Sequence, residues 1–222
     1  QVLPCMYSRL SIFAAVPNLE ASLLFVYPKK LATGVFDYAN YRSSPAGGDY
    51  NVILAEVEEL YDQFGGGIVK HVNGIRRYAQ FMHSLSQQKP VGLFLIGKGI
   101  REANVATTLA TGPGARANVL NYAMNLVPSF GQPSSDQSMT SNLPGTDKWT
   151  PLIPTGRISV NNLSELALYL DKVKAFELAQ DSTSMYDSPG KDWQKHLIHF
   201  AGGGNANEQF IFQTYLNGMA DI

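Results

Sequence analysis

The stretch that decides the fold is Ser134–Glu177, which opens with SSDQSM and closes with PLIPTGRISVNNLSELALYLDKVKAFE. Its opening predicts a polar strand end that carries an acid, Asp136. The apolar residues of Leu152–Ile158 predict a short strand. A pair of asparagines then precedes an amphipathic helix predicted over Leu163–Ala179, and either one is suited to cap it. The stretch therefore predicts one strand and one helix of a larger pattern.

Four other apolar runs extend that pattern in both directions. Leu23–Tyr27, Val52–Val57 and Pro90–Ile96 predict buried strands, and the last of these is the most continuously apolar and so the best candidate for a central strand. Leu197–Ala201 predicts a fifth strand, followed by a helix over Glu208–Met219. Helical spacing fills most of the intervals, so the chain predicts an α/β fold with a mainly parallel sheet and helices on both faces.

Residues 98–150 do not fit this alternation. They are rich in Gly, Pro, Ser and Thr, and they predict only one helix, at Ala115–Met124. Irregular segments of this length are uncommon inside a domain, and those that occur are usually functional or inserted.

The bulk composition narrows the class of protein. The chain has 222 residues, 45% of them hydrophobic and 16% charged, with a net charge of −1. A net charge this close to zero does not indicate binding to nucleic acid or to an anionic membrane. No apolar run reaches the ~18 residues of a helix that spans a membrane. We expect neither a nucleic-acid partner nor a membrane span. Because the chain starts at Gln1, we expect it to be a segment of a longer protein.

Two glycine-rich turns partly match nucleotide-binding motifs. Gly92–Gly99 nearly matches a phosphate-binding loop, but its last position lacks a hydroxyl and its middle belongs in a strand. Gly202–Gly204 lies between a predicted strand and a helix, where Asn205 or Asn207 as a helix cap explains the pattern. Both are interpreted as structural turns, and a nucleotide-binding doubly wound domain stays as an alternative.

Thiol, imidazole and carboxylate groups show no catalytic spacing. The single cysteine, Cys5, excludes an internal disulfide and is interpreted as a small buried hydrophobe. The four histidines have no zinc-ligand spacing. Asp136 fits an Asx turn or a helix cap, whereas Arg157 lies inside a predicted strand and needs a partner, for which Asp136 and Asp147 are the candidates.

Five segments, in order, resemble one family, the gingipain-like cysteine peptidases, which include the type IX secretion sortase. The resemblance extends over roughly Leu23–Met219, nearly the whole chain, and the segments are specific as a combination. The segments are Glu56–Phe81 (EVEELYDQFGGGIVKHVNGIRRYAQF), Pro90–Ile100 (PVGLFLIGKGI), SSDQ at Ser134–Gln137, IPTGRISVNNLSELALYLDKVKAFE, and Asp192–Gly203 (DWQKHLIHFAGG).

The resemblance implies a caspase-like three-layer sandwich and a secreted or surface protein of Bacteroidetes-type bacteria. It also implies proteolysis by a Cys–His dyad located C-terminal of Ile222, so this chain alone is expected to be inactive and to contain no catalytic residue. Two positions depart from the family, because Lys98 replaces an acid and Gly202 replaces a glutamate that some members use to support the histidine.

The resulting assignment divides the chain into an N-terminal extension, 1–22, and the N-terminal part of a peptidase domain, 23–222. Asp136, Arg157 and Glu208 are assigned as site-edge or structural residues. We expect no cofactor. Some family members bind calcium structurally, but the acids here are too dispersed to predict a site. The expected partners are a protein or peptide substrate and the remainder of the domain; a non-catalytic caspase-like structural or binding domain is the other alternative.

Overall fold

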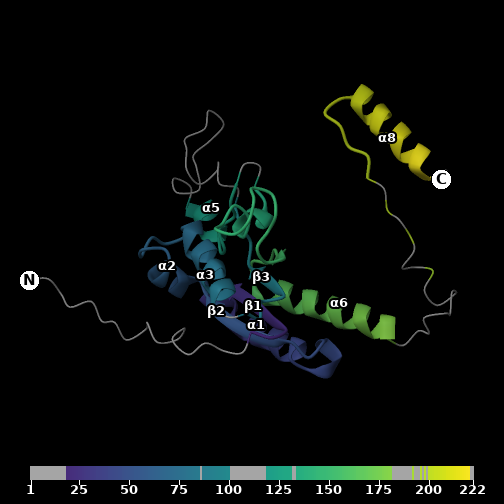
Figure 1. Ribbon diagram of the computed structural model, residues 1–222. Coiled ribbons are helices and arrows are strands. Elements are labelled where there is room, and N and C mark those ends of the chain that lie inside the picture. The colour runs from purple at the N-terminus through teal and green to yellow at the C-terminus, as the bar shows by residue number, and fades with distance from the viewer. Residues whose placement is uncertain are drawn as a thin grey trace, which may run out of the picture. The chain divides into compact units, whose positions relative to one another are not determined.

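The computed structural model describes residues 19–85, 87–100, 119–131, 134–181, 192, 196, 198 and 200–220. Contacts divide the chain into two units, Gln1–Val173 and Lys174–Ile222, and each is described by itself. The first unit contains a sheet with its helices, and the second contains the end of helix α6 and helix α8 (Figure 1).

The first unit is built on a four-stranded parallel sheet in the order β2-β1-β3-β4. The strands are β1 (Ser22–Tyr27), β2 (Asn51–Glu56), β3 (Gly92–Ile96) and β4 (Thr155–Ile158). Phe25 of the fully buried β1 pairs in register with residues of both neighbouring strands. The expected parallel sheet is confirmed, and β3 is one of its two central strands.

Helices cover both faces of this sheet, which gives the three-layer α/β sandwich that the sequence predicts (Figure 1). Helices α1 (Ala32–Arg42) and α6 (Leu163–Asp181) pack on one face, where Phe25 meets Tyr38 and Leu166. Because side chains alternate along a strand, Leu24 and Val26 of β1 point to the opposite face.

That opposite face is covered by two helices and one irregular segment. Helices α2 (Val57–Gln63) and α3 (Val72–Ser84) contribute residues such as Leu60 and Ile75. Val127, Met139 and Ile153, from residues 126–153, fill the rest of the same core. This irregular segment thus takes the place that a helix would occupy between β3 and β4. It also contains the 3-10 helix η3 (Asp136–Met139), and it follows the short helix α5 (Val119–Met124).

Strand β4 is shorter than expected, and hydrogen bonds explain why. Leu152 donates its backbone N–H to Thr140 O at 2.9 Å, and Ile153 O accepts the Thr140 hydroxyl at 2.8 Å. These backbone groups are therefore committed to the irregular segment and not to β3, so the prediction of a strand from Leu152 was wrong by three residues.

The second unit confirms the last helix but not the strand predicted before it. Helix α8 spans Ala206–Ala220. Ile198, Phe200 and Ala201 have no regular secondary structure, and Leu197 and His199 lie outside the described residues. No helix in the described part of either unit is long and apolar enough to cross a membrane.

Candidate functional site

The carboxyl ends of β3 and β4 meet at the guanidinium of Arg157. Its Nε lies 3.0 Å from both carboxylate oxygens of Asp136, and its Nη2 lies 2.8 Å from Oδ1 of the same residue. Nη1 donates to Gly97 O at 2.7 Å and to Val127 O at 2.8 Å, and Nη2 also donates to Pro128 O at 3.2 Å. All five N–H donors of the side chain are thereby used.

This cluster is a clamp that joins β3, β4 and the irregular segment. The side chains of Arg157 and Asp136 are only 10% and 26% exposed, so the charges compensate each other largely out of water. Of the two candidate partners for Arg157, the structure selects Asp136. The sequence predicts Asp136 at a strand end, and this prediction is wrong because the residue opens the 3-10 helix η3.

The glycines after β3 are required by the packing around the clamp. Gly97 has φ +136°, a conformation that favours glycine. At Gly99 a Cβ would lie 2.9 Å from Val127 O and 3.1 Å from Nη1 of Arg157. The resemblance of this turn to a phosphate loop therefore has a structural explanation.

The backbone amides of the same turn are also occupied. Gly97 donates to Ile158 O and Lys98 to Val160 O, each at 2.9 Å, and Ile100 donates to Asn125 Oδ1 at 3.1 Å. A phosphate cradle needs such amides to point at the ligand. These three N–H groups point into the fold instead.

The other candidate acids hold local turns. The Asp147 carboxylate accepts from the backbone N–H of Trp149 and of Thr150, both at 2.7 Å, and from the Thr150 hydroxyl at 2.9 Å. These hydrogen bonds hold the pKa of Asp147 below its ordinary value of 3.8. Asp147 therefore organises its own loop, and it is not the partner of Arg157.

Glu208 belongs to the second unit, where it caps α8. It accepts from Gly204 N at 2.8 Å, while its own N–H donates to Asn205 Oδ1 at 3.0 Å. The same Asn-x-x-Glu arrangement starts α6, where Glu165 N donates to Asn162 Oδ1 at 2.9 Å. The glycine turn before α8 is thus held by the helix start, where Asn205 is the cap and Glu208 accepts from the N–H of the residue before it.

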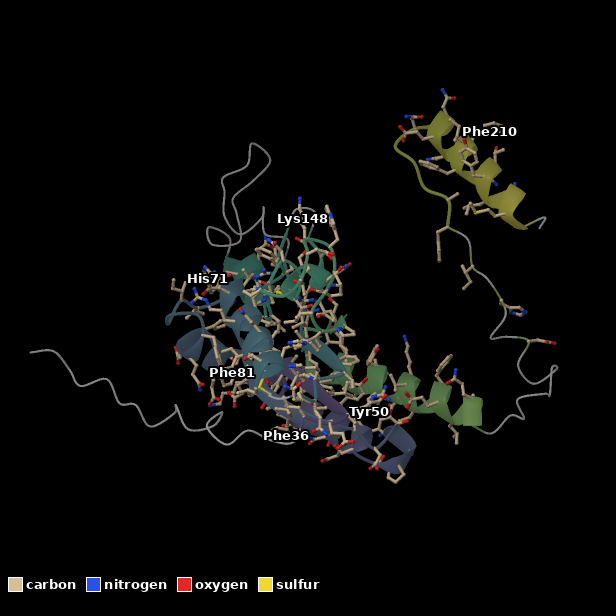
Figure 2. All side chains as sticks on the ribbon, viewed as in Figure 1. Phe36, Tyr50, His71, Phe81, Lys148 and Phe210 are labelled. Carbon is tan, nitrogen blue, oxygen red and sulfur yellow. The ribbon has the colours of Figure 1, made fainter. Side chains whose placement is uncertain are left out.

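No thiol and imidazole come together in the described part of the chain. Cys5 and His199 lie outside it. His71 stands at the start of α3 (Figure 2), where its Nδ1 accepts from Asn73 N at 3.1 Å. His83 lies at the other end of α3, and burial together with nearby Lys89 lowers its pKa. Among the described residues, no group of three or more His, Cys, Asp or Glu side chains could hold a metal ion.

Comparison with known proteins assigns the chain to a family. The family model for peptidase family C25 matches residues 16–221. The chain belongs to peptidase family C25. No match was found among curated protein sequences.

A solved structure supports the fold of this C25 chain. This chain is similar to the crystal structure of dimeric latent PorU from Porphyromonas gingivalis, with a TM-score of 0.55 and 16% sequence identity. The match covers 83% of this chain and 20% of the PorU chain, so the chain spans about a fifth of that relative. At this identity the likeness establishes the α/β fold and not the activity.

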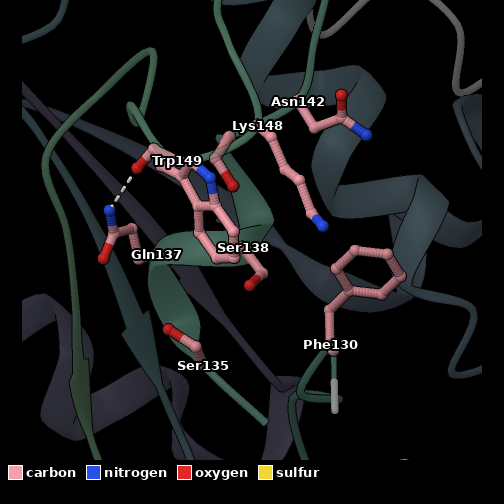
Figure 3. A pocket seen from close by; sticks show the side chains of 9 residues that line it. Phe130, Ser135, Gln137, Ser138, Asn142, Lys148 and Trp149 are labelled. Atoms are coloured by element: carbon pink, nitrogen blue, oxygen red, sulfur yellow. Dashed lines mark hydrogen bonds between the residues drawn. The ribbon is translucent and has the colours of Figure 1, made fainter. Parts of the chain in front are cut away.

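A second feature of the C25 chain, which the sequence did not predict, is a recess in the irregular segment (Figure 3). Its cavity has a volume of about 380 Å³ and is lined by aromatic rings, hydroxyls, amides and one ammonium group. The length of residues 98–150 was the one available signal, since it marked this segment as functional or inserted. The lining residues are Phe130, Gly131, Ser135, Gln137, Ser138, Ser141, Asn142, Lys148 and Trp149.

Proposed function

We propose that this chain is the N-terminal part of a C25 cysteine endopeptidase domain and that residues C-terminal of Ile222 supply the Cys–His dyad. The observation that carries the proposal is the family match over residues 16–221. It is supported by the parallel sheet, because functional sites of such sheets form outside the carboxyl ends of the strands.

In this proposal, the chain positions the substrate and the dyad performs the chemistry. The thiolate sulfur bonds to the peptide carbonyl carbon, and the histidine donates a proton to the leaving amine. Water then releases the acyl group in hydrolysis, or an amine takes it in a sortase reaction. Arg157 and Asp136 serve as positioning residues, since they fix the strand ends that form one wall of the cleft.

The same assignment gives the expected setting of the protein. The substrate is a protein or peptide, the other partner is the remainder of the domain, and the location is secreted or on the cell surface. A digestive peptidase and a type IX secretion sortase fit equally, and product analysis separates them, because only the sortase joins the acyl group to a new amine.

A non-catalytic domain is the second candidate, and two residues favour it. Lys98 and Gly202 stand where the family resemblance places acids. Without a carboxylate to orient and stabilise the histidine, a dyad loses part of its activation.

The full-length protein that contains this chain tests the proposal against fluorogenic peptides. We expect hydrolysis that iodoacetamide abolishes, since alkylation blocks the thiolate. The 222-residue chain should show none, and Cys5→Ser in the full-length protein should leave the rate unchanged. A folded full-length protein without activity would favour the non-catalytic domain, and loss of activity in the Cys5→Ser variant would place the nucleophile in this chain.

A further inference from the structure

The recess in the irregular segment combines two rings with one cation. Lys148 Nζ lies 4.7 Å from the centroid of the Trp149 ring. Figure 3 shows Lys148 reaching across the recess toward Phe130, with the indole of Trp149 on its other side. Trp149 is 73% exposed, so a large aromatic surface is available to a ligand. Lys148 is the only ionisable residue of the lining.

A second positive charge lies behind this recess. Arg76 of α3 is 8% exposed and donates to the backbone oxygens of Ser138, Ser141 and Asn142, three of the lining residues. Its guanidinium also lies 4.6 Å from the centroid of the Phe130 ring. Burial lowers the pKa of Arg76, and among the described residues it makes no ion pair. A buried cation thus supports the recess, and no carboxylate in the described part of the chain pairs with it.

Asp147, the acid adjacent to Lys148 in sequence, is ionised but makes no ion pair with Lys148 among the described residues. The Asp147 carboxylate accepts from Trp149 N, Thr150 N and the Thr150 hydroxyl. This turn fixes the backbone on both sides of Lys148. A hydrogen bond from the Gln137 side chain to Trp149 O, drawn in Figure 3, holds the same loop against η3. The backbone that carries the cation and the indole is therefore held by hydrogen bonds within the chain.

We propose that this recess binds a peptide segment that presents a carboxylate. The carboxylate pairs with Lys148, the neighbouring apolar side chain contacts Trp149 and Phe130, and the lining hydroxyls and amides face the peptide backbone. The choice of a peptide rests on the proposed peptidase function, whereas the choice of an anion rests on the charges of Arg76 and Lys148 alone. The carboxylate comes from a chain terminus or from an acidic side chain.

Tryptophan fluorescence of the 222-residue chain tests this binding directly. The chain has two tryptophans, so Trp193→Phe leaves Trp149 as the sole reporter. Three probes without aromatic rings distinguish the sources: acetyl-Ala-Leu-Leu with a free carboxylate, the same peptide as its amide, and acetyl-Ala-Leu-Glu-amide. We expect at least one carboxylate peptide to bind about tenfold more tightly than the neutral amide, and the affinity to fall with added salt.

Lys148→Gln should weaken carboxylate binding about tenfold and abolish the preference over the amide. Lys172→Gln, an exposed lysine on α6, is the matched control and should change nothing. Tighter binding of the free terminus identifies a chain end as the source, and tighter binding of the glutamate peptide identifies a side chain.

Three outcomes would overturn the proposal. The first is equal binding of all three peptides, and the second is unchanged binding in Lys148→Gln. The third is a fluorescence response to polygalacturonate, a carboxylate polymer that is not a peptide, without a response to any peptide. Because this test reads binding by the chain alone, its failure leaves the hydrolysis test of the full-length protein intact.

Discussion

Two buried arginines hold the irregular segment to the regular elements, and they do so with different partners. Arg157 of β4 combines three backbone carbonyls with the carboxylate of Asp136. Arg76 of α3 also binds three carbonyls but has no ion-pair partner among the described residues. An ion pair neutralises the charge of Arg157, whereas the charge of Arg76 has no such partner among the described residues and, in our proposal, helps to attract an anion. An arginine can therefore serve a structural role in one region, as Arg157 does, and support a proposed binding recess in another, as Arg76 does.

The largest effect is expected from breaking the clamp. Arg157→Ala should lower the free energy of unfolding by about 3 kcal/mol, because it leaves Asp136 and three carbonyls without their donor. Urea denaturation measures this change. Asp136→Asn keeps the shape and some hydrogen bonds, so its loss should be smaller. A loss below about 1 kcal/mol for Arg157→Ala would mean that the cluster does not hold the strand ends.

A smaller effect is expected at the other arginine. Arg76→Met should cost about 2 kcal/mol in urea denaturation, since it frees carbonyls but leaves no unpaired acid. The adjacent Arg77, which is exposed and donates to Phe64 O, provides the control: Arg77→Met should change the free energy of unfolding by no more than about 0.5 kcal/mol. If Arg76→Met lowers the free energy of unfolding more than Arg157→Ala does, the contrast between the two arginines is wrong.

The smallest effect concerns the loop that carries Lys148 and Trp149. The pKa of Asp147 is lowered in the folded chain. The ionised carboxylate therefore stabilises the turn fully above its unfolded pKa, and this stabilisation is lost as the pH falls through the folded pKa. Trp149 fluorescence, read in Trp193→Phe, should change with a midpoint below 3.8. Asp147→Asn should remove that transition. A midpoint at or above 3.8 would show that the turn does not hold the indole.

Local sequence predicted the parts of the fold that local patterns control. Continuous apolar runs located β1, β2 and β3, and helical spacing between the strands predicted the helices that cover both faces of the sheet. A buried charge in a strand was enough to predict a partner for Arg157, although not to choose between two acids.

The irregular segment escaped prediction because its contacts join distant residues. Arg76 meets carbonyls 62 to 66 positions away, and Arg157 meets one 60 positions away. Backbone carbonyls carry no sequence signal, so neither the 3-10 helix at Asp136 nor the recess beside it could be read from residue types. Glu208 shows the reverse case, since its capping box lies within four residues of sequence.

A peptidyl acyloxymethyl ketone probe tests whether the reacting thiol proposed for the full-length protein lies C-terminal of this chain. The full-length protein is labelled, and mass spectrometry locates the modified residue. We expect a labelled cysteine C-terminal of Ile222, with labelling lost when the histidine of the proposed downstream dyad is changed. Labelling at Cys5 would contradict it.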